Sequence, residues 1–412
     1  MDIKDYIDKN RQRMLDELFD LLRIPSVSAD PAFTDDVKHC AEAVANSLRD
    51  AGASNVEVLA TPGHPIVFGE YHVSDEVPTV LVYGHYDVQP ADPIDLWDNP
   101  AFEPIIKITP THPEGAIFAR GSCDDKGQMF MHVKALESMK ASGDVPCNIK
   151  FIIEGEEEVG SSHLDAFLEN HKDKFAADVV LVSDTGIIAN DIPSITVGLR
   201  GLSYVEVEVT GPNRDLHSGL YGGSAPNPIN ILCEMIASLK DEDQRITVEG
   251  FYDDVYELTK EEREAMAKAP FNEASHRESI GIGAHEGEPD YSPAERMSIR
   301  PTLDINGIWG GYINEGAKTV IASTATAKVS MRLVPYQDHD KITALFTKHF
   351  NKIAPPSVTV KVTEMHGAAP AVTPTDSAAY HAASLAMKHT YGKDPVPVRS
   401  GGSIPIVASF ER

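Results

Sequence analysis

The stretch "NIKFIIEGEEEVGS", residues 148–161, decides the fold, because a continuous apolar segment runs directly into three glutamates. Continuous apolar runs, in contrast to alternating ones, are typical of strands that are buried on both faces of a parallel sheet. Two further runs have this character, "TVLVYG" at 79–84 and "DVVLVSD" at 178–184. The sequence therefore predicts an α/β fold with a mostly parallel sheet in the first half of the chain.

Helical segments alternate with these runs. The stretch 124–143 has the apolar spacing of a helix, and 162–171 predicts a second helix, which Ser162 and Asp165 would open as a capping box. Residues 1–22 also predict a helix, and their acidic residues exclude the apolar core of a signal peptide. Alternation of helices and strands is typical of an α/β domain flanked by helices.

A different pattern begins near residue 193. The segment "SYVEVEV", residues 203–209, alternates strictly, which predicts a strand with one face in water. The elements expected after it are a helix at 226–240, strands at 319–323 and 326–334, a helix at 339–350 and a strand at 357–365. This βαββαβ order is ferredoxin-like. A polar insert at about 245–300 interrupts it, with a second capping box at Thr259 and Glu262.

The length of 412 residues exceeds one ordinary core and predicts two domains. Helix and strand signals of the first style return after residue 368. We therefore expect an α/β domain that is discontinuous in sequence, made of residues 1–192 and 368–412. A second, α+β domain at 193–367 would be inserted into it.

The composition limits the partners. Lysine and arginine number 36 and aspartate and glutamate 63, a net charge of −27, which argues against nucleic-acid and anionic-membrane partners. No apolar run approaches the ~20 residues that span a bilayer. Four scattered cysteines without a CxxC pair predict free thiols in a reducing compartment, so we expect a cytoplasmic protein.

Side chains that can bind metal follow each predicted strand. They are His85 with Asp87, the glutamates 156–158, Asp184, and Asp124 with Asp125 in a loop before a helix. Each group alone has an ordinary explanation, such as a capped turn or an acidic helix N-terminus. Ligands of open α/β sheets bind beyond the carboxyl ends of the strands, and carboxylates gathered there repel one another unless cations neutralise them. The sequence therefore predicts a metal site at this edge.

Carboxylates with imidazole and without thiolate suit Zn²⁺ or Mn²⁺. The charges favour two ions, because three carboxylates and one hydroxide balance two divalent cations. Such a pair activates water, and a neighbouring carboxylate takes the water's proton. The residues alone leave open which of Glu156, Glu157 and Glu158 binds metal and which acts as the base.

Several motifs carry a resemblance to a known family. They are "GHYDVQP" (84–90), "ARGSCDDKGQ" (119–128), "EGEEEVGS" (154–161), "DLHSGLYGG" (215–223), "MRLVP" (331–335) and "RSGGSIP" (399–405). In this order, over nearly the whole chain, they resemble the dinuclear metallopeptidases of the carnosinase and cytosolic non-specific dipeptidase type. Glutamate carboxypeptidase, acetylornithine deacetylase and succinyl-diaminopimelate desuccinylase are related. The resemblance implies a catalytic α/β domain and an inserted ferredoxin-like lid and dimerisation domain.

The resemblance also implies roles for the metal-capable residues. The ligands of two Zn²⁺ or Mn²⁺ ions per subunit would be His85, Asp124, Glu158 and Asp184, with Asp124 as the bridge. Glu157 would be the general base and acid, and Asp87 would lie behind His85 and fix its tautomer. Glu156 would be only solvated, and the Asp124–Asp125 peptide bond would be cis.

The inserted domain would supply the substrate contacts. By resemblance, His217 reaches the active site of the other subunit of a homodimer and polarises the scissile carbonyl. Arg332 would clamp the substrate's C-terminal carboxylate, a role that suits bidentate guanidinium geometry. Thr319, His366 and Ser403 match further substrate contacts. The expected reaction is the hydrolysis of dipeptides with a free C-terminal carboxylate.

One departure from the family pattern stands out. The family's last metal ligand is a histidine beyond "GGSIP", and no histidine follows position 389 here. We expect the sequence to be truncated at its C-terminal end. Two alternatives remain: a deacylase or desuccinylase of N-acyl amino acids or a carboxypeptidase of the same family, and a catalytically silent metal-binding member.

Overall fold

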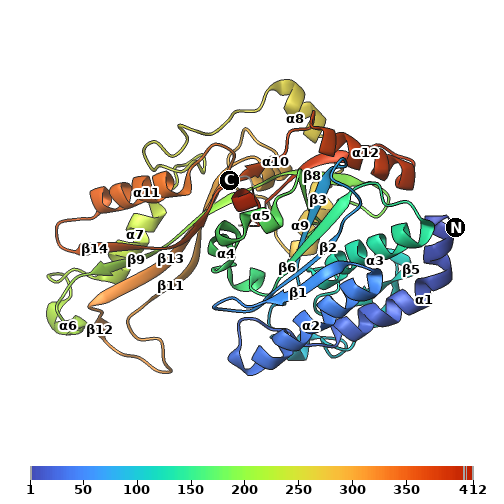
Figure 1. The fold of residues 1–412 in the computed structure, drawn as a ribbon. Helices are drawn as coiled ribbons and strands as arrows, with labels where there is room; N and C mark the ends of the chain where they lie inside the picture. The colour runs from blue at the N-terminus through green and yellow to red at the C-terminus, as the bar shows by residue number, and fades with distance from the viewer. Residues whose placement is uncertain (1, 402–403, 405, 411–412) are drawn as a thin grey trace. The chain divides into compact units, whose positions relative to one another are not determined.

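The computed structural model describes residues 2–401, 404 and 406–410 (Figure 1). The chain divides into two compact units, and the boundary between them in the sequence lies between Gly186 and Ile187. In the described part, every helix is too short or too polar to cross a membrane. The discontinuous domain of residues 1–192 and 368–412 stays a prediction.

The first unit is built on a five-stranded sheet with the order β1-β2-β6-β3-β7. The three predicted strands are β3 (Thr79–His85), β6 (Asn148–Glu154) and β7 (Val179–Val182), and β3 lies parallel to both of the others. The antiparallel strands β1 (Ser54–Leu59) and β2 (Ile66–Tyr71) extend it beyond β6. The sheet is therefore mixed and not mostly parallel as predicted, because β2 pairs antiparallel with both β1 and β6. A short connection joins β1 and β2 as a hairpin.

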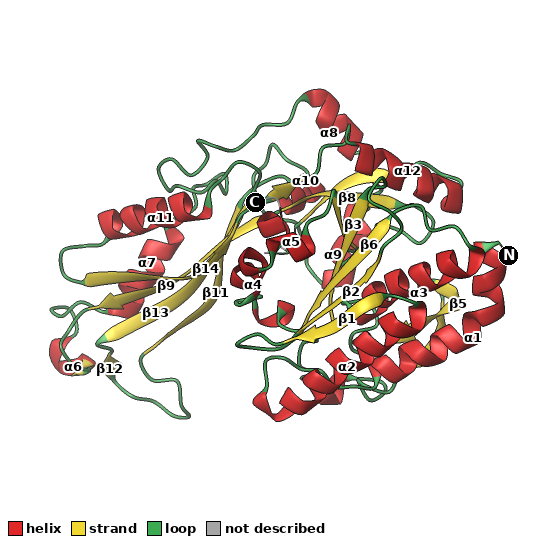
Figure 2. Ribbon diagram, in the orientation of Figure 1, coloured by secondary structure: helices red, strands yellow, loops and turns green. Residues whose placement is uncertain are grey.

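Helices cover both faces of this sheet (Figures 1 and 2). One face packs on α1 (Ile3–Leu22), α2 (Thr34–Ala51) and α3 (Lys126–Ser142). Val67 of β2 belongs to this core. Phe68 lies on the opposite face, where its ring packs against that of Phe175 with the ring centroids 5.4 Å apart. Burial on both faces explains why β3 and β6 are continuous apolar runs.

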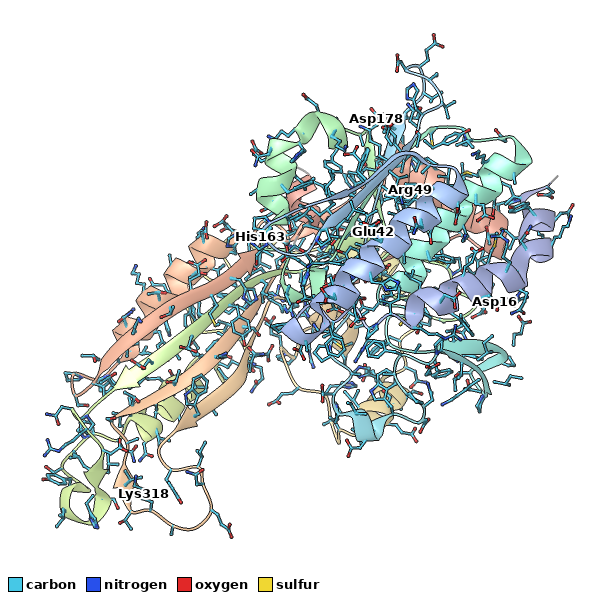
Figure 3. The ribbon with its side chains drawn as sticks, turned by 60° about the horizontal axis from the view of Figure 1, so that its bottom comes forward. Asp16, Glu42, Arg49, His163, Asp178 and Lys318 are labelled. Carbon is cyan, nitrogen blue, oxygen red and sulfur yellow. The ribbon has the colours of Figure 1, made fainter. Side chains whose placement is uncertain are left out.

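The surface helices show the usual division between buried and exposed sides. Glu42 and Arg49 lie on the exposed side of α2 (Figure 3). The helix α4 (Leu164–Asn170) has His163 as its N-cap and no capping side-chain hydrogen bond, so the capping box predicted at Ser162 and Asp165 is wrong. The remaining elements of the unit are α5 (Lys172–Phe175), β4 (Ile105–Thr109), β5 (His112–Phe118), and the 3₁₀ turns η1 (Pro31–Phe33), η2 (Ile94–Leu96) and η3 (Glu157–Val159).

The second unit contains an antiparallel sheet with the order β11-β13-β9-β14. Its elements are β9 (Gly201–Thr210), α7 (Pro228–Ala237), β11 (Thr302–Gly310), β13 (Thr324–Leu333), α11 (His339–Ile353) and β14 (Thr359–Ala368). This is the expected βαββαβ order, but the second strand is β11. The segment 319–323 instead contributes β12 (Val320–Ile321), which pairs with β10 (Leu216–His217).

The alternation of β9 divides the sheet into two faces. Val205, Val207 and Val209 are fully buried in a core that includes Leu232 of α7 and Phe346 of α11. The alternate side chains between these valines are only partly buried. The face opposite the two helices is therefore polar, as the sequence predicts.

The polar insert folds into α8 (Lys260–Met266), α9 (Glu273–Ile280) and α10 (Pro293–Ser298). The capping box predicted for α8 is confirmed, because the Thr259 N–H donates to Glu262 Oε2 at 2.7 Å and the Glu262 N–H donates to Thr259 Oγ1 at 3.3 Å. The buried Arg300 holds parts of the insert together: its Nη2 lies 2.8 Å from Glu288 Oε2, and its guanidinium lies over the ring of Tyr291 at 4.2 Å.

A second small sheet, with the order β15-β8-β16, completes this unit. It consists of β8 (Ser194–Leu199), β15 (Ala371–Val372) and β16 (Val396–Ser400), and β16 runs parallel to β8. The helices α6 (Ser218–Tyr221), α12 (Ala378–Tyr391) and α13 (Val407–Phe410) are the remaining elements.

Candidate metal centre

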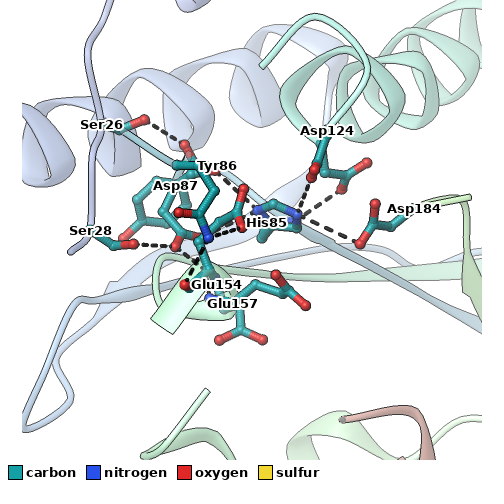
Figure 4. A network of polar contacts seen from close by, with 12 residues as sticks. Ser26, Ser28, His85, Tyr86, Asp87, Asp124, Glu154, Glu157 and Asp184 are labelled. Carbon is teal, nitrogen blue, oxygen red and sulfur yellow. Dashed lines mark hydrogen bonds and ion pairs between the residues drawn. The ribbon is translucent and has the colours of Figure 1, made fainter. Parts of the chain in front are cut away.

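The carboxyl end of the first sheet gathers the metal-capable side chains of the first unit (Figure 4). His85 ends β3, and its neighbour in the parallel register is Glu154, the last residue of β6. The glutamates follow β6 directly, and Asp184 follows β7. Parallel strands bring their carboxyl ends to one edge, which explains how residues about a hundred positions apart in the sequence meet.

His85 lies at the centre of a compact group. Its Nε2 is 3.1 Å from Asp124 Oδ1 and 3.7 Å from Asp184 Oδ2, and one ligand atom from each of the three residues lies within 4.8 Å of the others. His85 is fully buried, and its Nε2 has no hydrogen-bond partner among the described residues. A buried nitrogen without a hydrogen bond, facing two carboxylates, fits a divalent cation of the Zn²⁺ or Mn²⁺ type.

Asp87 lies behind His85, as the resemblance implies. His85 Nδ1 is 3.1 Å from the Asp87 carbonyl oxygen and 3.3 Å from Asp87 Oδ1. Both neighbours are acceptors, so in a neutral ring Nδ1 carries the proton and Nε2 presents its lone pair to the group. A histidine ligand oriented through its other nitrogen is the usual arrangement at protein metal sites.

The glutamate turn is attached to the same aspartate. The N–H groups of Glu157 and Glu158 donate to Asp87 Oδ1 and Oδ2 at 3.3 and 3.1 Å. The Gln89 amide nitrogen donates to Glu158 Oε2 at 2.8 Å. Glu158 does not belong to the compact group of His85, Asp124 and Asp184. Burial, followed by the charge of Asp124, raises the pKa of its carboxyl.

The electrostatics of the protein alone indicate a shortage of positive charge. Burial raises the pKa of Glu157 and of Asp125 to about 8 each, and the charge of Asp184 adds to both shifts. Burial opposes the charge on His85, yet Asp124, Asp184 and Asp87 raise the pKa of its imidazole well above its ordinary value. The cluster therefore holds protons where a cation would otherwise balance the carboxylates.

Asp125 lies directly behind the group. Its Oδ2 accepts a hydrogen bond from the His85 N–H at 3.1 Å, and its side chain is buried. The Asp124–Asp125 peptide bond is cis, as expected. Asp125 thereby ties the loop that carries Asp124 to the end of β3.

Glu156 corrects one expectation, since it is not simply solvated. Its carboxylate pairs with His163 Nδ1 at 2.9 Å, and its side chain is only 12% exposed. A Cβ on Gly63 would meet this carboxylate at 1.8 Å, so the loop approaches it closely. Glu156 therefore helps to hold the turn in place through His163.

Three supporting contacts surround this group, and only the first involves a residue with a simple sequence signal. Glu154, also buried, accepts hydrogen bonds from Tyr83 Oη at 2.7 Å and Ser161 Oγ at 2.9 Å, and burial raises its pKa to about 7. The His132 ring lies 2.7 Å from the hydroxyl of Ser183, the residue before Asp184. The third contact joins Ser28 Oγ to Asp87 Oδ2 at 2.6 Å. Glu154 alone had a signal, as an acidic residue that ends an apolar run.

The second unit brings two predicted substrate residues together. Thr319 Oγ1 lies 3.3 Å from His217 Nε2, and the Gly219 N–H donates to His217 Nδ1 at 3.0 Å. Because Nδ1 accepts this bond, a neutral His217 ring carries its proton on Nε2. His217 therefore presents an N–H donor at an exposed position.

Two other predicted substrate residues lie on the polar face of the second sheet. The His366 ring stacks on Tyr204 with centroids 5.0 Å apart. Burial, followed by the charge of Arg332, lowers the pKa of His366, so Arg332 lies close enough to disfavour the charged form of this imidazole. Ser403 lies outside the described residues.

Comparisons with known proteins identify the family of this chain. A model of peptidase family M20/M25/M40 matches residues 81–410. Cys-Gly metallodipeptidase dug1 of Schizosaccharomyces pombe is 32% identical, over 99% of this chain and 88% of that protein. Human carnosine dipeptidase 1 has a similar structure, with a TM-score of 0.84 and 30% identity over 99% and 88% of the two chains. The M20 metallo-carboxypeptidase Sso-CP2 of Sulfolobus solfataricus reaches 0.85 and 32% over 96% and 88%.

The match covers most of the chain, so this protein belongs to peptidase family M20/M25/M40. The predictions of a peptide-bond hydrolase and of a place in the dipeptidase branch are confirmed, since the similar proteins include Cys-Gly and carnosine dipeptidases.

Proposed function

We propose that this protein is a metal-dependent dipeptidase that hydrolyses dipeptides with a free C-terminal carboxylate. The observation that carries the proposal is the buried His85, whose Nε2 faces Asp124 and Asp184 while Asp87 joins it to the turn of the glutamates. The relatives named as dipeptidases support the substrate class.

The proposed cofactors are two Zn²⁺ or Mn²⁺ ions per subunit. Their proposed ligands are His85, Asp124, Glu158 and Asp184, with Asp124 shared. The carboxylate-rich donor set supports hard or borderline divalent cations. When bound, these ions lower the pKa of water and stabilise negative charge on the substrate oxygen.

Glu157 is the proposed general base and acid. It is not one of the compact group's three residues, and burial raises the pKa of its carboxyl to about 8 in the metal-free protein. Cations bound beside it lower this pKa, which leaves the carboxylate ionised and able to accept a proton. Glu157 accepts the proton of the attacking water and delivers it to the leaving amine.

The substrate is proposed to lie against residues of the second unit. His217 donates its Nε2 proton to the scissile carbonyl oxygen, and the Gly219 N–H keeps the ring in this tautomer. Arg332 binds the C-terminal carboxylate through its guanidinium. Thr319, His366 and Ser403 complete the contacts.

The remaining parts of the proposal concern organisation. The catalytic domain comprises residues 1–192 and 368–412, and residues 193–367 form a lid and dimerisation domain. The active form is a cytoplasmic homodimer in which His217 serves the partner's site. Free thiols, with no disulfide among the described residues, support a reducing compartment.

Substrate panels separate this proposal from its alternatives. After loading with Mn²⁺ or Zn²⁺, we expect dipeptides to be cleaved faster than N-acyl amino acids and faster than longer peptides. The similarity to Sso-CP2 favours a carboxypeptidase as the second candidate, and release of single C-terminal residues from longer peptides at a comparable rate would establish it. A metal-loaded dimer that cleaves no member of the panel would indicate a silent family member.

A further inference from the structure

The carboxylate of Asp87 accepts hydrogen bonds from groups other than His85, the histidine that it lies behind. Asp87 is fully buried, and a buried carboxylate is stable only when hydrogen bonds replace its hydration. Glu157 and Glu158 supply two backbone donors, and His85 Nδ1 is close to Oδ1. These three neighbours belong to the proposed catalytic machinery. Because each of them contacts the Asp87 carboxylate, their positions depend on its orientation.

One donor comes from outside that machinery. The hydroxyl of Ser28 donates to Asp87 Oδ2 at 2.6 Å, the shortest of the bonds to this carboxylate (Figure 4). Oδ2 also accepts the Glu158 N–H, so the hydroxyl fixes the oxygen that orients the glutamate turn. Hydrogen bonds to an ionised acceptor are stronger than those between neutral groups.

The position of Ser28 is itself fixed by the backbone. Val27 forms a parallel bridge with Val88, and the Val88 N–H donates to the Ser26 carbonyl at 3.0 Å. The Ser26 hydroxyl donates to the Tyr86 carbonyl at 2.6 Å, and a ring nitrogen of His64 lies 3.2 Å from the Ser28 carbonyl. Residues 26–28 thus run as a short strap beside residues 86–88, which carry Asp87.

We propose that Ser28 is a positioning residue, whose hydroxyl sets the rotamer of Asp87 and through it the orientation of both His85 and the Glu157–Glu158 turn. The inference rests on the proposed function. Ser28 touches neither substrate nor metal, and its effect passes through Asp87. Without this hydroxyl, the remaining donors to the Asp87 carboxylate among the described residues are the N–H groups of Glu157 and Glu158 and Nδ1 of His85, whose own positions depend on Asp87.

The test compares three variants for Mn²⁺ affinity, measured by calorimetric titration of the metal-free full chain. Ser28→Ala is expected to weaken binding up to about 10-fold, the lower end of the 10- to 100-fold loss that follows removal of a direct partner of a metal ligand, because Ser28 acts through Asp87. Ser28→Thr keeps a hydroxyl and should bind within about threefold of wild type. Ser138→Ala is the matched control, because it removes a bond of 2.7 Å from a buried serine hydroxyl to a backbone carbonyl, that of Lys134, outside the strap.

Each outcome decides the matter. Equal affinities of Ser28→Ala and Ser138→Ala overturn the proposal, and so does an equal loss in Ser28→Ala and Ser28→Thr, since the hydroxyl would not be the cause. The urea midpoint of each metal-free variant shows whether a loss of affinity follows a general loss of stability, which a merely structural serine would cause. If the wild type binds Mn²⁺ without cleaving dipeptides, only the proposed function fails. If it binds no Mn²⁺, both fail.

Discussion

The hydroxyl oxygen of Thr319 lies 3.3 Å from Nε2 of His217, and both side chains are exposed. The pairing of β10 with β12 brings them together, since His217 lies opposite Val320. Two exposed side chains that satisfy each other can exchange this contact for one to a ligand at little cost in desolvation. This contact is therefore compatible with the proposed role of His217, which would bind the substrate only after the homodimer has formed.

The first prediction concerns this assembly. His217→Ala and Glu157→Gln should each abolish most activity, and a mixture of the two, unfolded and refolded together, should recover about a quarter of wild-type activity, because half of the dimers then contain one intact site. Activity against a dipeptide is measured before and after mixing. No recovery, with dimers present by light scattering, contradicts action between subunits.

The second prediction concerns the base. Glu157→Gln keeps the size of the side chain and the N–H donor to Asp87, but removes the proton acceptor. We expect kcat to fall by about 10²- to 10⁴-fold with Mn²⁺ affinity retained. Glu156→Gln is the control, since Glu156 contacts His163 instead, and its kcat should stay within a fewfold of wild type. Near-normal turnover of Glu157→Gln would refute the role of Glu157.

The third prediction concerns the ions. Saturation with Mn²⁺ followed by dialysis should leave two ions per chain, measured by mass spectrometry of the metal content. Asp184→Asn should remove about one ion, because it removes one negatively charged ligand atom from the His85 group. Asp124→Ala should remove both ions, as expected of a shared ligand. Loss of the same single ion in both variants would contradict a bridging Asp124.

The fourth prediction concerns pH. Glu154 has a folded pKa of about 7, raised by burial from 4.5, so the folded state binds more protons than the unfolded state between these values. Its contribution to the stability is therefore present at low pH and lost as pH rises from about 4.5 to 7, a difference of about 3 kcal/mol.

Glu154→Gln provides the measurement. The amide oxygen still accepts from Tyr83 and Ser161, but the group no longer titrates. The Tm of the metal-free variant should therefore rise relative to wild type between pH 5 and pH 8. A Tm difference that stays constant over this range would contradict a raised pKa for Glu154.

The fifth prediction concerns the polar insert. Arg300 and Glu288 form a buried ion pair, with side chains 3% and 7% exposed. Arg300→Met should lower the free energy of unfolding of this unit by about 3–5 kcal/mol, because Glu288 is left buried without its partner. Arg263→Met breaks the more exposed pair with Glu295 and should cost about 1 kcal/mol or less. Urea denaturation compares the two, and equal losses would contradict the role of burial.

The sequence predicts those parts of the fold where one physical requirement controls the pattern. The strands β3 and β6 are buried on both faces, which requires continuous apolar residues, and β9 packs on one face only, which requires alternation. The strand β11 gives a weak signal, because it lies at the edge of its sheet and contains Asp304, Gly307 and other poor strand formers.

The candidate site divides in the same way. His85 and Asp184 are predictable, since they follow apolar strands whose carboxyl ends must meet. Their supports are not, because Ser28 lies 59 residues from Asp87 and His132 lies 51 residues from Ser183. A serine on a loop or a histidine on a helix has no local pattern that reveals a partner so distant along the chain.

Lys126, the residue after Asp125, has a consequence for protein design. Its fully buried ammonium donates to the carbonyl oxygens of Leu21 at 3.2 Å and Ile24 at 2.6 Å, at the end of α1. The turn that carries Asp124 is thereby fastened to the N-terminal helix. A designer who grafts the four proposed ligands and their loops onto another scaffold must transplant the end of this helix as well, because the loop that carries Asp124 depends on it.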